Sequence, residues 1–222
     1  MERATTSASS EGEFRFKVVL LGEGAVGKSS LMLRYVEDKF SPRHVSTIQA
    51  SFLSKRLDLG DNHVDLDIWD TAGQEKYHAL GPIYYRGSHG ALLIYDITDK
   101  RSFEKVKIWV RELQRALGET AVLIVVGNKL DLESERTVDR TEAIQYAKSV
   151  NAEYVETSAK ENLGLADLFE KISSLMIDKW EKTREISGRT SQNSSSSNGS
   201  RRGIQLVDEQ NDAAQRTGKC CK

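Results

Sequence analysis

Cysteine is scarce in this chain of 222 residues: only Cys220 and Cys221 are present, and both lie in the last three positions. Two adjacent cysteines cannot build a disulfide framework, and the rest of the chain has no Cys/His spacing typical of a zinc site. The four histidines are scattered along the sequence, without the short spacings that histidine metal sites need. The sequence therefore argues against a disulfide-stapled scaffold and against a zinc centre.

Long apolar runs and an excess of either charge are also missing. No apolar run approaches the ~20 residues of a membrane-spanning helix. The formal net charge is −1, so the basic excess expected of a nucleic-acid-binding protein is absent. The N-terminal residues 1–13 are polar and acidic, unlike a secretory signal, and the lack of glycine at position 2 excludes myristoylation. We expect a cytosolic protein without a nucleic-acid partner.

Composition divides the chain into a leader, a body and a tail. Residues 1–13 are predicted to be a disordered leader. Residues 14–183 carry the apolar patterns of one domain, and about 170 residues can bury roughly two-thirds of their unfolded surface. Residues 184–222 include the Ser/Gly-rich stretch SGRTSQNSSSSNGSRRG, which predicts a flexible tail.

Apolar patterns within the body alternate between strand and helix. Continuous apolar runs at 14–22, 90–98 and 121–129 predict strands buried on both faces. Two alternating runs joined by Gly60-Asp61-Asn62 predict a hairpin, and a sixth strand is expected near 152–158. The expected helices span residues 29–40, 102–117, 140–150 and 164–180, the second of them capped by Ser102. This order predicts an α/β domain with a six-stranded, mostly parallel sheet, one antiparallel edge strand and helices on both faces.

The segment GEGAVGKSS, residues 22–30, matches the phosphate-loop pattern G-x-x-x-x-G-K-[ST] between a buried strand and a helix. Such glycines let backbone N–H groups converge on phosphate oxygens, and the helix N-terminus adds positive potential. Lys28 is expected to reach the β- and γ-phosphates, and the Ser29 hydroxyl to bind Mg²⁺. The nucleotide-binding residues predicted here are Gly22, Gly24, Ala25, Val26, Gly27, Lys28, Ser29 and Ser30. The motif alone leaves open an ATP-driven kinase or motor, a GTP switch and a degenerate binding module.

The segment VVGNKLD indicates that the base is guanine. The carboxylate of Asp131 can accept hydrogen bonds from guanine N1–H and the 2-amino group together, whereas adenine would leave it unpaired. Asn128 is expected to support the base edge and the neighbouring loop, and Lys129 to lie along the ring. The base site is predicted at the carboxyl edge of the sheet, where such folds bind ligands.

The segment ETSAK follows the next predicted strand and repeats this logic. The backbone N–H of Ala159 is expected to donate to guanine O6, with Ser158 and Lys160 shaping the loop. Phe40, at the end of the first helix, is expected to lie against the base, although a core residue at a helix end would look the same. Together the two loops favour guanine over adenine.

The segment DIWDTAGQE is predicted to sense the γ-phosphate. Asp70 ends a strand and can hold Mg²⁺ through water. The N–H of Gly73 can approach the γ-phosphate, and Gln74 can orient an attacking water. Thr47 is expected to complete the Mg²⁺ shell with its hydroxyl. The predicted catalytic residues are Gln74, Lys28 and Gly73, and the predicted metal ligands are Ser29, Thr47 and Asp70.

These segments resemble the five guanine-nucleotide motifs of Ras-like small GTPases over residues 14–183. Within that group, DIWDTAGQEKYHALGPIYYRGS, LLIYDIT and ETSAK look like the Rab family, and TIQASF and YHALGPIYYRG look most like its early-endosomal branch. The resemblance implies a G domain that binds GTP or GDP with Mg²⁺, and an effector-binding aromatic triad of Phe52, Trp69 and Tyr84, which could also be hairpin core.

The resemblance also gives a reason for the two cysteines. Rab proteins use C-terminal cysteine pairs as geranylgeranyl sites, and two lipid chains anchor stably where one is marginal. Cys220 and Cys221 do not fit the C-a-a-X pattern, because Lys219 is the fourth residue from the end. Modification is therefore expected by the Rab route, with an escort protein, although an unmodified thiol pair remains the alternative.

The function implied is that of a monomeric switch on the cytoplasmic face of endosomal or vesicle membranes. Its expected partners are an exchange factor, a GTPase-activating protein, a GDP dissociation inhibitor, a Rab escort protein and effectors. No arginine is evident that could act in cis, Arg43 being the nearest, so hydrolysis is expected to be slow without an activator worth ~10³–10⁵ in rate. The alternative is a nucleotide-binding scaffold with little hydrolysis.

Overall fold

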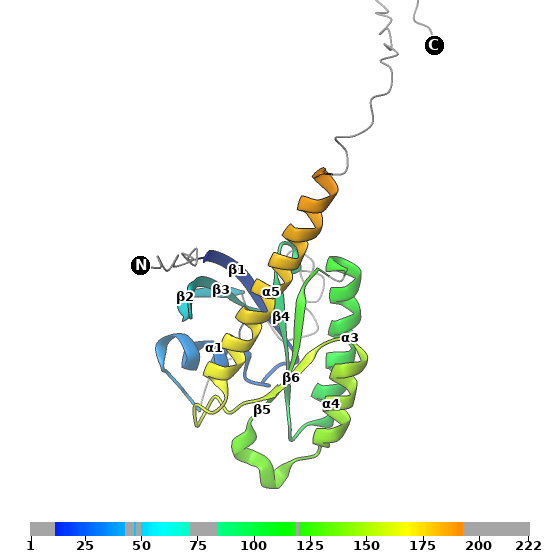
Figure 1. Ribbon diagram of the computed structural model, residues 1–222. Helices are drawn as coiled ribbons and strands as arrows, with labels where there is room; N and C mark the ends of the chain where they lie inside the picture. Colours follow the sequence, from blue (N-terminus) through cyan, green and yellow to red (C-terminus); the bar gives the residue numbers. More distant parts are fainter. Residues whose placement is uncertain (1–11, 43–46, 48–49, 72–83, 119, 193–222) are drawn as a thin grey trace, which may run out of the picture. The chain divides into compact units, whose positions relative to one another are not determined.

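The computed structural model of the chain describes residues 12–42, 47, 50–71, 84–118 and 120–192 (Figure 1). The strands are β1 (Gly12–Leu21), β2 (Ser51–Leu59), β3 (Asn62–Asp70), β4 (Gly90–Asp96), β5 (Val122–Asn128) and β6 (Glu153–Glu156). The helices are α1 (Lys28–Glu37), α3 (Lys100–Leu117), the 3-10 helix η2 (Leu130–Glu135), α4 (Arg140–Ser149) and α5 (Leu165–Gln192). Contacts divide the chain into units of residues 1–184 and 185–222; the expected domain limits at residues 13 and 183 stay predictions.

The strands form a six-stranded sheet in the order β2-β3-β1-β4-β5-β6. The strand β1 pairs in parallel with β3 and β4, and β4–β5 and β5–β6 are also parallel, whereas β2 pairs antiparallel with β3. Gly60 provides the positive φ of 63° that the β2–β3 turn requires. The predicted fold class is confirmed, with the antiparallel strand at the edge.

Side chains on the two faces of the sheet enter two separate cores. Phe16, Val18 and Leu20 of β1 join the core under α1 and α5, while Val19 and Leu21 join the core under α3 and α4. Figure 1 shows these helix pairs on opposite faces of the sheet. Because the chain crosses a parallel sheet in one direction, the loops after β1, β4, β5 and β6 all reach the same edge.

Three details of the helices differ from the sequence-based expectation. The expected Ser102 cap is wrong: Asp99 caps α3, its side chain accepting from the N–H of Arg101 at 2.9 Å. Ser102 is instead fully buried, where its hydroxyl accepts from the N–H of Asp96 at 3.0 Å. Helix η2 was not expected, and α5 continues past Trp180 to Gln192. Among the described helices, none is long and apolar enough to cross a membrane.

Candidate nucleotide-binding site

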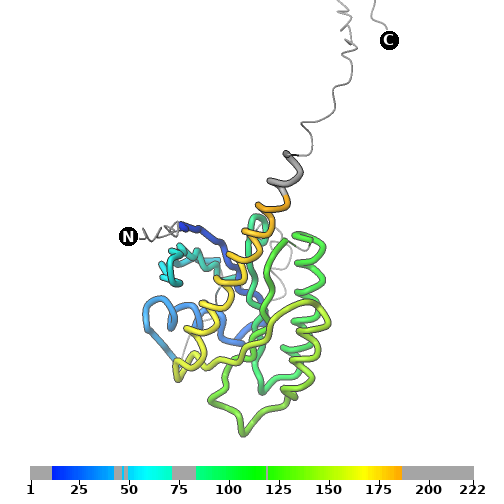
Figure 2. Tube along the Cα trace, viewed as in Figure 1, coloured from blue at the N-terminus to red at the C-terminus, as the bar shows by residue number. Residues whose placement is uncertain are grey.

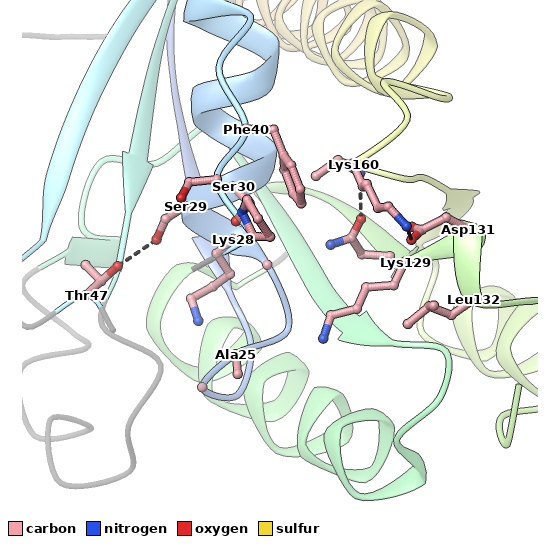
Figure 3. A pocket seen from close by; sticks show the side chains of 16 residues that line it. Ala25, Lys28, Ser29, Ser30, Phe40, Thr47, Lys129, Asp131, Leu132 and Lys160 are labelled. Atoms are coloured by element: carbon pink, nitrogen blue, oxygen red, sulfur yellow. Dashed lines mark hydrogen bonds and ion pairs between the residues drawn. The ribbon is translucent and has the colours of Figure 1, made fainter. Parts of the chain in front are cut away.

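A cavity of about 740 Å³ lies at the edge where the parallel strands end (Figure 3). Its lining residues are Gly24, Ala25, Gly27, Lys28, Ser29, Ser30, Phe40, Ser41, Pro42, Thr47, Asn128, Lys129, Asp131, Leu132, Ala159 and Lys160. Thr47 and Ser29 stand at one end and Asp131 and Lys160 at the other (Figure 3). The structure therefore brings together four segments that the sequence analysis selected separately. Ser41, Pro42 and Leu132 were not foreseen, because nothing in their residue type marks them as lining a pocket.

Two glycines of the phosphate loop stand where a side chain would collide. A Cβ on Gly22, whose φ is +151°, would lie 2.1 Å from the carbonyl oxygen of Ile94. A Cβ on Gly27, at φ +98°, would lie 2.4 Å from the side-chain nitrogen of Asn128. The loop can therefore close against β4 and against the base segment only with glycine at these positions.

Lys28, the first residue of α1, bridges the phosphate loop from within. Its Nζ donates to the carbonyl oxygens of Gly22 and Glu23, both at 2.9 Å, and the residue is 5% exposed. Burial lowers the pKa of Lys28 to about 8, against the opposing attraction of Asp70 and Glu23. A buried cation that donates to carbonyl oxygens of its own phosphate loop is suited to stabilising phosphate charge.

An oxygen cluster formed by Ser29, Thr47 and Asp70 lies next to Lys28. The Ser29 hydroxyl donates to Asp70 Oδ2 at 2.5 Å and shares a 2.6 Å hydrogen bond with the Thr47 hydroxyl. Thr47 Oγ1 also donates to Asp70 Oδ2 at 3.4 Å. Hydroxyl and carboxylate oxygens are the hard ligands that Mg²⁺ prefers. The cluster therefore fits a Mg²⁺ ion.

Other metal arrangements are not supported by the described part of the chain. Within the described residues, no group of three or more His, Cys, Asp or Glu side chains could hold an ion. Mg²⁺ sites in proteins commonly combine one or two protein ligands with phosphate oxygens and water.

Asn128 joins the base segment to two other loops. Its Nδ2 donates to the carbonyl oxygen of Val26 at 2.8 Å, and its Oδ1 accepts from Thr157 Oγ1 at 3.1 Å. The same Oδ1 accepts from the N–H of Ala159 at 3.4 Å. Asn128 is 1% exposed, so these contacts hold the phosphate loop and the 157–160 loop together beneath the cavity.

Asp131 presents its carboxylate at the far end of the cavity. Its Oδ1 accepts from Ser158 Oγ at 2.6 Å, and Oδ2 lies 3.4 Å from Lys160 Nζ. The N–H of Leu130 donates to the Thr157 carbonyl at 3.0 Å, which ties the start of η2 to the same loop. Ser158 is not among the residues that line the cavity; its hydroxyl donates to Asp131 and so fixes the position of that carboxylate.

Lys129 has a partner that the sequence analysis missed. Its Nζ lies 2.6 Å from Asp96 Oδ2, while Oδ1 of the same carboxylate accepts from the N–H and hydroxyl of Thr98. Asp96 ends β4 and is 8% exposed. Its place at the carboxyl end of a strand beside β5 is a signal that could have identified it.

The aromatic residues of the sequence analysis occupy two places. Phe40 lines the cavity and also contacts the core under α1; its contact with the base stays a prediction. The rings of Phe52 and Trp69 stack with centroids 5.1 Å apart, and Phe52 is 54% exposed. Trp69 and Tyr84 both contact the core under α3. The predicted residues outside the described part of the chain are Gly73, Gln74, Cys220 and Cys221.

The cavity has a buried lysine and a glycine loop at one end and a carboxylate at the other, the three elements that the sequence predicts for a guanine-nucleotide-binding protein. A family profile described as "Ras family" matches residues 17–178. The human Ras-related protein Rab-21 is 54% identical over 209 residues, which are 94% of this chain and 91% of that protein. The chain therefore belongs to the Rab family of Ras-like small GTPases.

Two relatives from Dictyostelium discoideum extend the comparison. Rab-21 is 52% identical over 165 residues, covering 74% of this chain and 78% of that protein. Rab-5A is 48% identical over 176 residues, covering 79% of this chain and 87% of that protein. The resemblance to the early-endosomal branch of the Rab family is confirmed, and the comparisons show that the chain is of the Rab-21 type. The chain binds guanine nucleotides, hydrolyses GTP and acts in endosomal membrane traffic through regulators and effectors.

Proposed function

We propose that the cavity holds GDP or GTP with Mg²⁺, with the base at the Asp131 end and the phosphates at the Lys28 end. The observation that carries this proposal is the meeting of four distant segments around one cavity. A carboxylate for the base stands at one end of the cavity, and the hydroxyl–carboxylate oxygen cluster lies next to Lys28. Asp131 accepts from guanine N1–H and the 2-amino group, and the Ala159 N–H donates to O6. Phe40 lies against the face of the base, and Lys129 along its ring.

The metal ligands in this proposal are the hydroxyls of Ser29 and Thr47, with Asp70 acting through water. When bound there, Mg²⁺ would supply positive charge next to the phosphate groups. Lys28 and the loop N–H groups of Gly24–Ser30 bind the phosphate oxygens directly. Asp70 orients the Ser29 hydroxyl, because the 2.5 Å hydrogen bond fixes its rotamer.

Hydrolysis in this scheme proceeds by in-line attack of water on the γ-phosphate. Gln74 orients the water, Gly73 donates its N–H to the γ-phosphate, and Lys28 stabilises the charge that develops. A GTPase-activating protein supplies an arginine in trans, which is worth ~10³–10⁵ in rate. The residue roles of Gly73 and Gln74 rest on the family resemblance.

The conformational output is the ordering of the segments that contain Thr47 and Gly73 by the γ-phosphate. Phe52, Trp69 and Tyr84 then present the effector-binding surface. An exchange factor reloads GTP, and a GDP dissociation inhibitor extracts the GDP form from the membrane. A Rab escort protein presents Cys220 and Cys221 for geranylgeranylation, which attaches the monomer to endosomal membranes.

The decisive experiment compares GTP binding with ATP binding and then measures single-turnover hydrolysis with an activating protein. We expect GTP to bind far more tightly than ATP, because only guanine donates two hydrogen bonds to Asp131. Gln74→Leu is expected to bind GTP normally and to lose stimulated hydrolysis by at least ~10²-fold. Equal binding of ATP would overturn the base site. Unchanged hydrolysis in Gln74→Leu would remove Gln74 from the mechanism, and wild-type protein inert with every activator would favour the scaffold.

The membrane part of the proposal has its own test. We expect the intact protein to fractionate with endosomes and the Cys220→Ser/Cys221→Ser double variant to stay in the soluble fraction. Each single variant keeps one lipid chain and is expected to bind membranes only marginally. Equal membrane association of wild type and the double variant would exclude the cysteine anchor without affecting the nucleotide site.

A further inference from the structure

Arg34, near the end of α1, makes a set of contacts that the proposed roles do not use. Its Nε donates to the carbonyl oxygen of Ala159 at 3.0 Å, and its Nη2 donates to that of Lys160 at 3.2 Å. Its Nη1 donates to Asp38 Oδ1 at 2.9 Å. The guanidinium carbon lies 5.7 Å from the centre of the Phe40 ring, and the side chain is 18% exposed. One arginine thus links the 157–160 loop to the aromatic ring that lines the same end of the cavity.

The loop that Arg34 holds carries the N–H proposed to bind guanine O6. The two residues before Ala159 are held by backbone hydrogen bonds. The Thr157 N–H donates to the Gly127 carbonyl at 2.8 Å, and Ser158 and Leu163 exchange two backbone hydrogen bonds of 3.0 Å. After the Ala159 N–H, the next two carbonyls are the ones that Arg34 binds. The Ala159 N–H shares a planar peptide unit with the Ser158 carbonyl, which accepts from the N–H of Leu163, and the Ala159 carbonyl that Arg34 binds belongs to the next peptide unit. Holding the peptide units on both sides of the Ala159 Cα restrains the rotations that aim its N–H.

The remaining bond to the Ala159 N–H is weak. It donates to Asn128 Oδ1 at 3.4 Å, beyond the usual N–H···O range of 2.7–3.2 Å. The direction of this N–H therefore depends on the backbone around it, and Arg34 supplies the restraint from outside the loop. Figure 2 shows the end of α1, in blue, close to the turn that precedes α5, in yellow.

We propose that Arg34 is a positioning residue for the guanine base: it holds the Ala159 N–H in line for O6. Arginine suits this role because its planar fork binds two adjacent carbonyls at once, which a lysine ammonium cannot do with the same geometry. The helix that carries Arg34 begins with Lys28 and Ser29, so a single rigid element connects the phosphate end to the O6 contact. This inference rests on the proposed guanine site.

The test measures how fast ribose-labelled GDP, IDP and 6-thio-GDP leave wild-type protein, Arg34→Lys and Arg34→Ala. IDP lacks the 2-amino group from which Asp131 would accept a hydrogen bond. In 6-thio-GDP only O6 is changed, to sulfur, which is a weak hydrogen-bond acceptor. The matched control is Arg111→Ala, because Arg111 is an exposed helical arginine that donates to a carbonyl of its own helix. Thermal unfolding of each variant is measured in parallel.

We expect Arg34→Ala to release GDP and IDP about tenfold faster, the effect of one charge-assisted hydrogen bond, and 6-thio-GDP less than about twofold faster. Arg34→Lys should fall between wild type and Arg34→Ala, and Arg111→Ala should match wild type. Equal acceleration of all three nucleotides, or of none, overturns the proposal and leaves Arg34 a general anchor of the fold. If Arg34→Ala does not fold, the proposal is tested by whether Arg34→Lys speeds the release of GDP more than the release of 6-thio-GDP. Wild-type protein that releases all three at one rate would instead disprove the guanine site itself.

Discussion

The base end and the phosphate end of the cavity are held in different ways. At the base end, side chains are bonded to one another and to backbone across the fold: Asn128 to Val26 and Thr157, and Asp131 to Ser158. At the phosphate end, Lys28 bonds to carbonyl oxygens of its own loop, and the Ser29 hydroxyl bonds to two other oxygens, those of Thr47 and Asp70. The side chains at the base end are therefore fixed by bonds across the fold, whereas the phosphate end has a charge arrangement suited to a cation and phosphates.

This difference separates two properties of a switch. A base end that is fixed by hydrogen bonds within the chain should contribute equally to the affinity for GDP and for GTP, since both carry the same base. A phosphate end built from a buried lysine and clustered oxygens responds to the charge of the bound phosphates. Substitutions at the two ends should therefore affect different measurements.

The largest effect is expected from Asp131→Asn at the base end. An amide nitrogen would face the guanine donors, so affinity for GDP and for GTP should fall by the same factor, roughly 10²–10⁴-fold. Xanthine nucleotides, which carry an oxygen in place of the 2-amino group, should bind better than guanine nucleotides. Equilibrium titration with GDP, GTP and the corresponding xanthine di- and triphosphates checks this. A loss of affinity for GTP alone would contradict the separation of the two ends.

Ser29→Asn is expected to have a smaller effect, and one that distinguishes GTP from GDP. Loss of the hydroxyl that bonds Asp70 and Thr47 weakens the metal site, and the triphosphate depends on the metal more than the diphosphate does. The ratio of GTP to GDP affinity should fall roughly 10–100-fold, with base preference unchanged. Nucleotide exchange measured with and without a chelator tests this; Ser30→Ala, which keeps Ser29, is the matched control. An unchanged ratio would remove Ser29 from the metal site.

Asp96→Asn should have a modest effect at the base end. Asparagine keeps the Oδ1 acceptor for Thr98 but loses the charge that pairs with Lys129. Because the pair is only partly buried, we expect GDP release to accelerate about three- to fivefold. Release of labelled GDP is the measurement, with exposed Asp65→Asn as control. Acceleration in both variants would point to general charge effects instead of Lys129.

The smallest effect is expected for His89, which lies outside both ends of the cavity and should influence only the pH dependence of stability. His89 Nδ1 accepts from the N–H of Lys17 at 3.0 Å, and burial, aided by the Lys17 charge, lowers the pKa of His89 below its usual 6.5. Between the lowered pKa and 6.5 the unfolded chain binds more protons, so stability falls as pH drops through that window. Denaturation at pH 7.5 to 5.0 should show this slope in wild type and a reduced slope in His89→Asn. Guanine selectivity should stay constant; a parallel change in selectivity would link His89 to the site.

Much of this architecture is predictable because its signals are local. Continuous apolar runs identify β1, β4 and β5, since a strand covered on both faces needs apolar side chains on both. The phosphate loop is readable because Gly22 and Gly27 serve a backbone conformation that other residues cannot adopt. The start of α3 was misjudged because Asp99 and Ser102 are both good capping residues, and only the fold decides which one is buried.

Contacts between distant segments were not readable in the same way. Arg34 and Asp96 are ordinary helix-end and strand-end residues in the sequence. Their roles appear only when α1 lies beside the 157–160 loop and β4 beside β5. Hydrogen bonds between residues 125 positions apart leave no periodic trace along the chain.

The sequence alone determined the α/β class, the phosphate loop and the choice of guanine, because each depends on residue types at short, fixed spacing. Tertiary structure decided which side chains surround those motifs and hold them: Arg34 behind Ala159, Asp96 beside Lys129, and Ser29, Thr47 and Asp70 within one cluster. The physical reason is that a parallel sheet gathers the ends of distant strands at one edge, and only there do their side chains come within bonding distance.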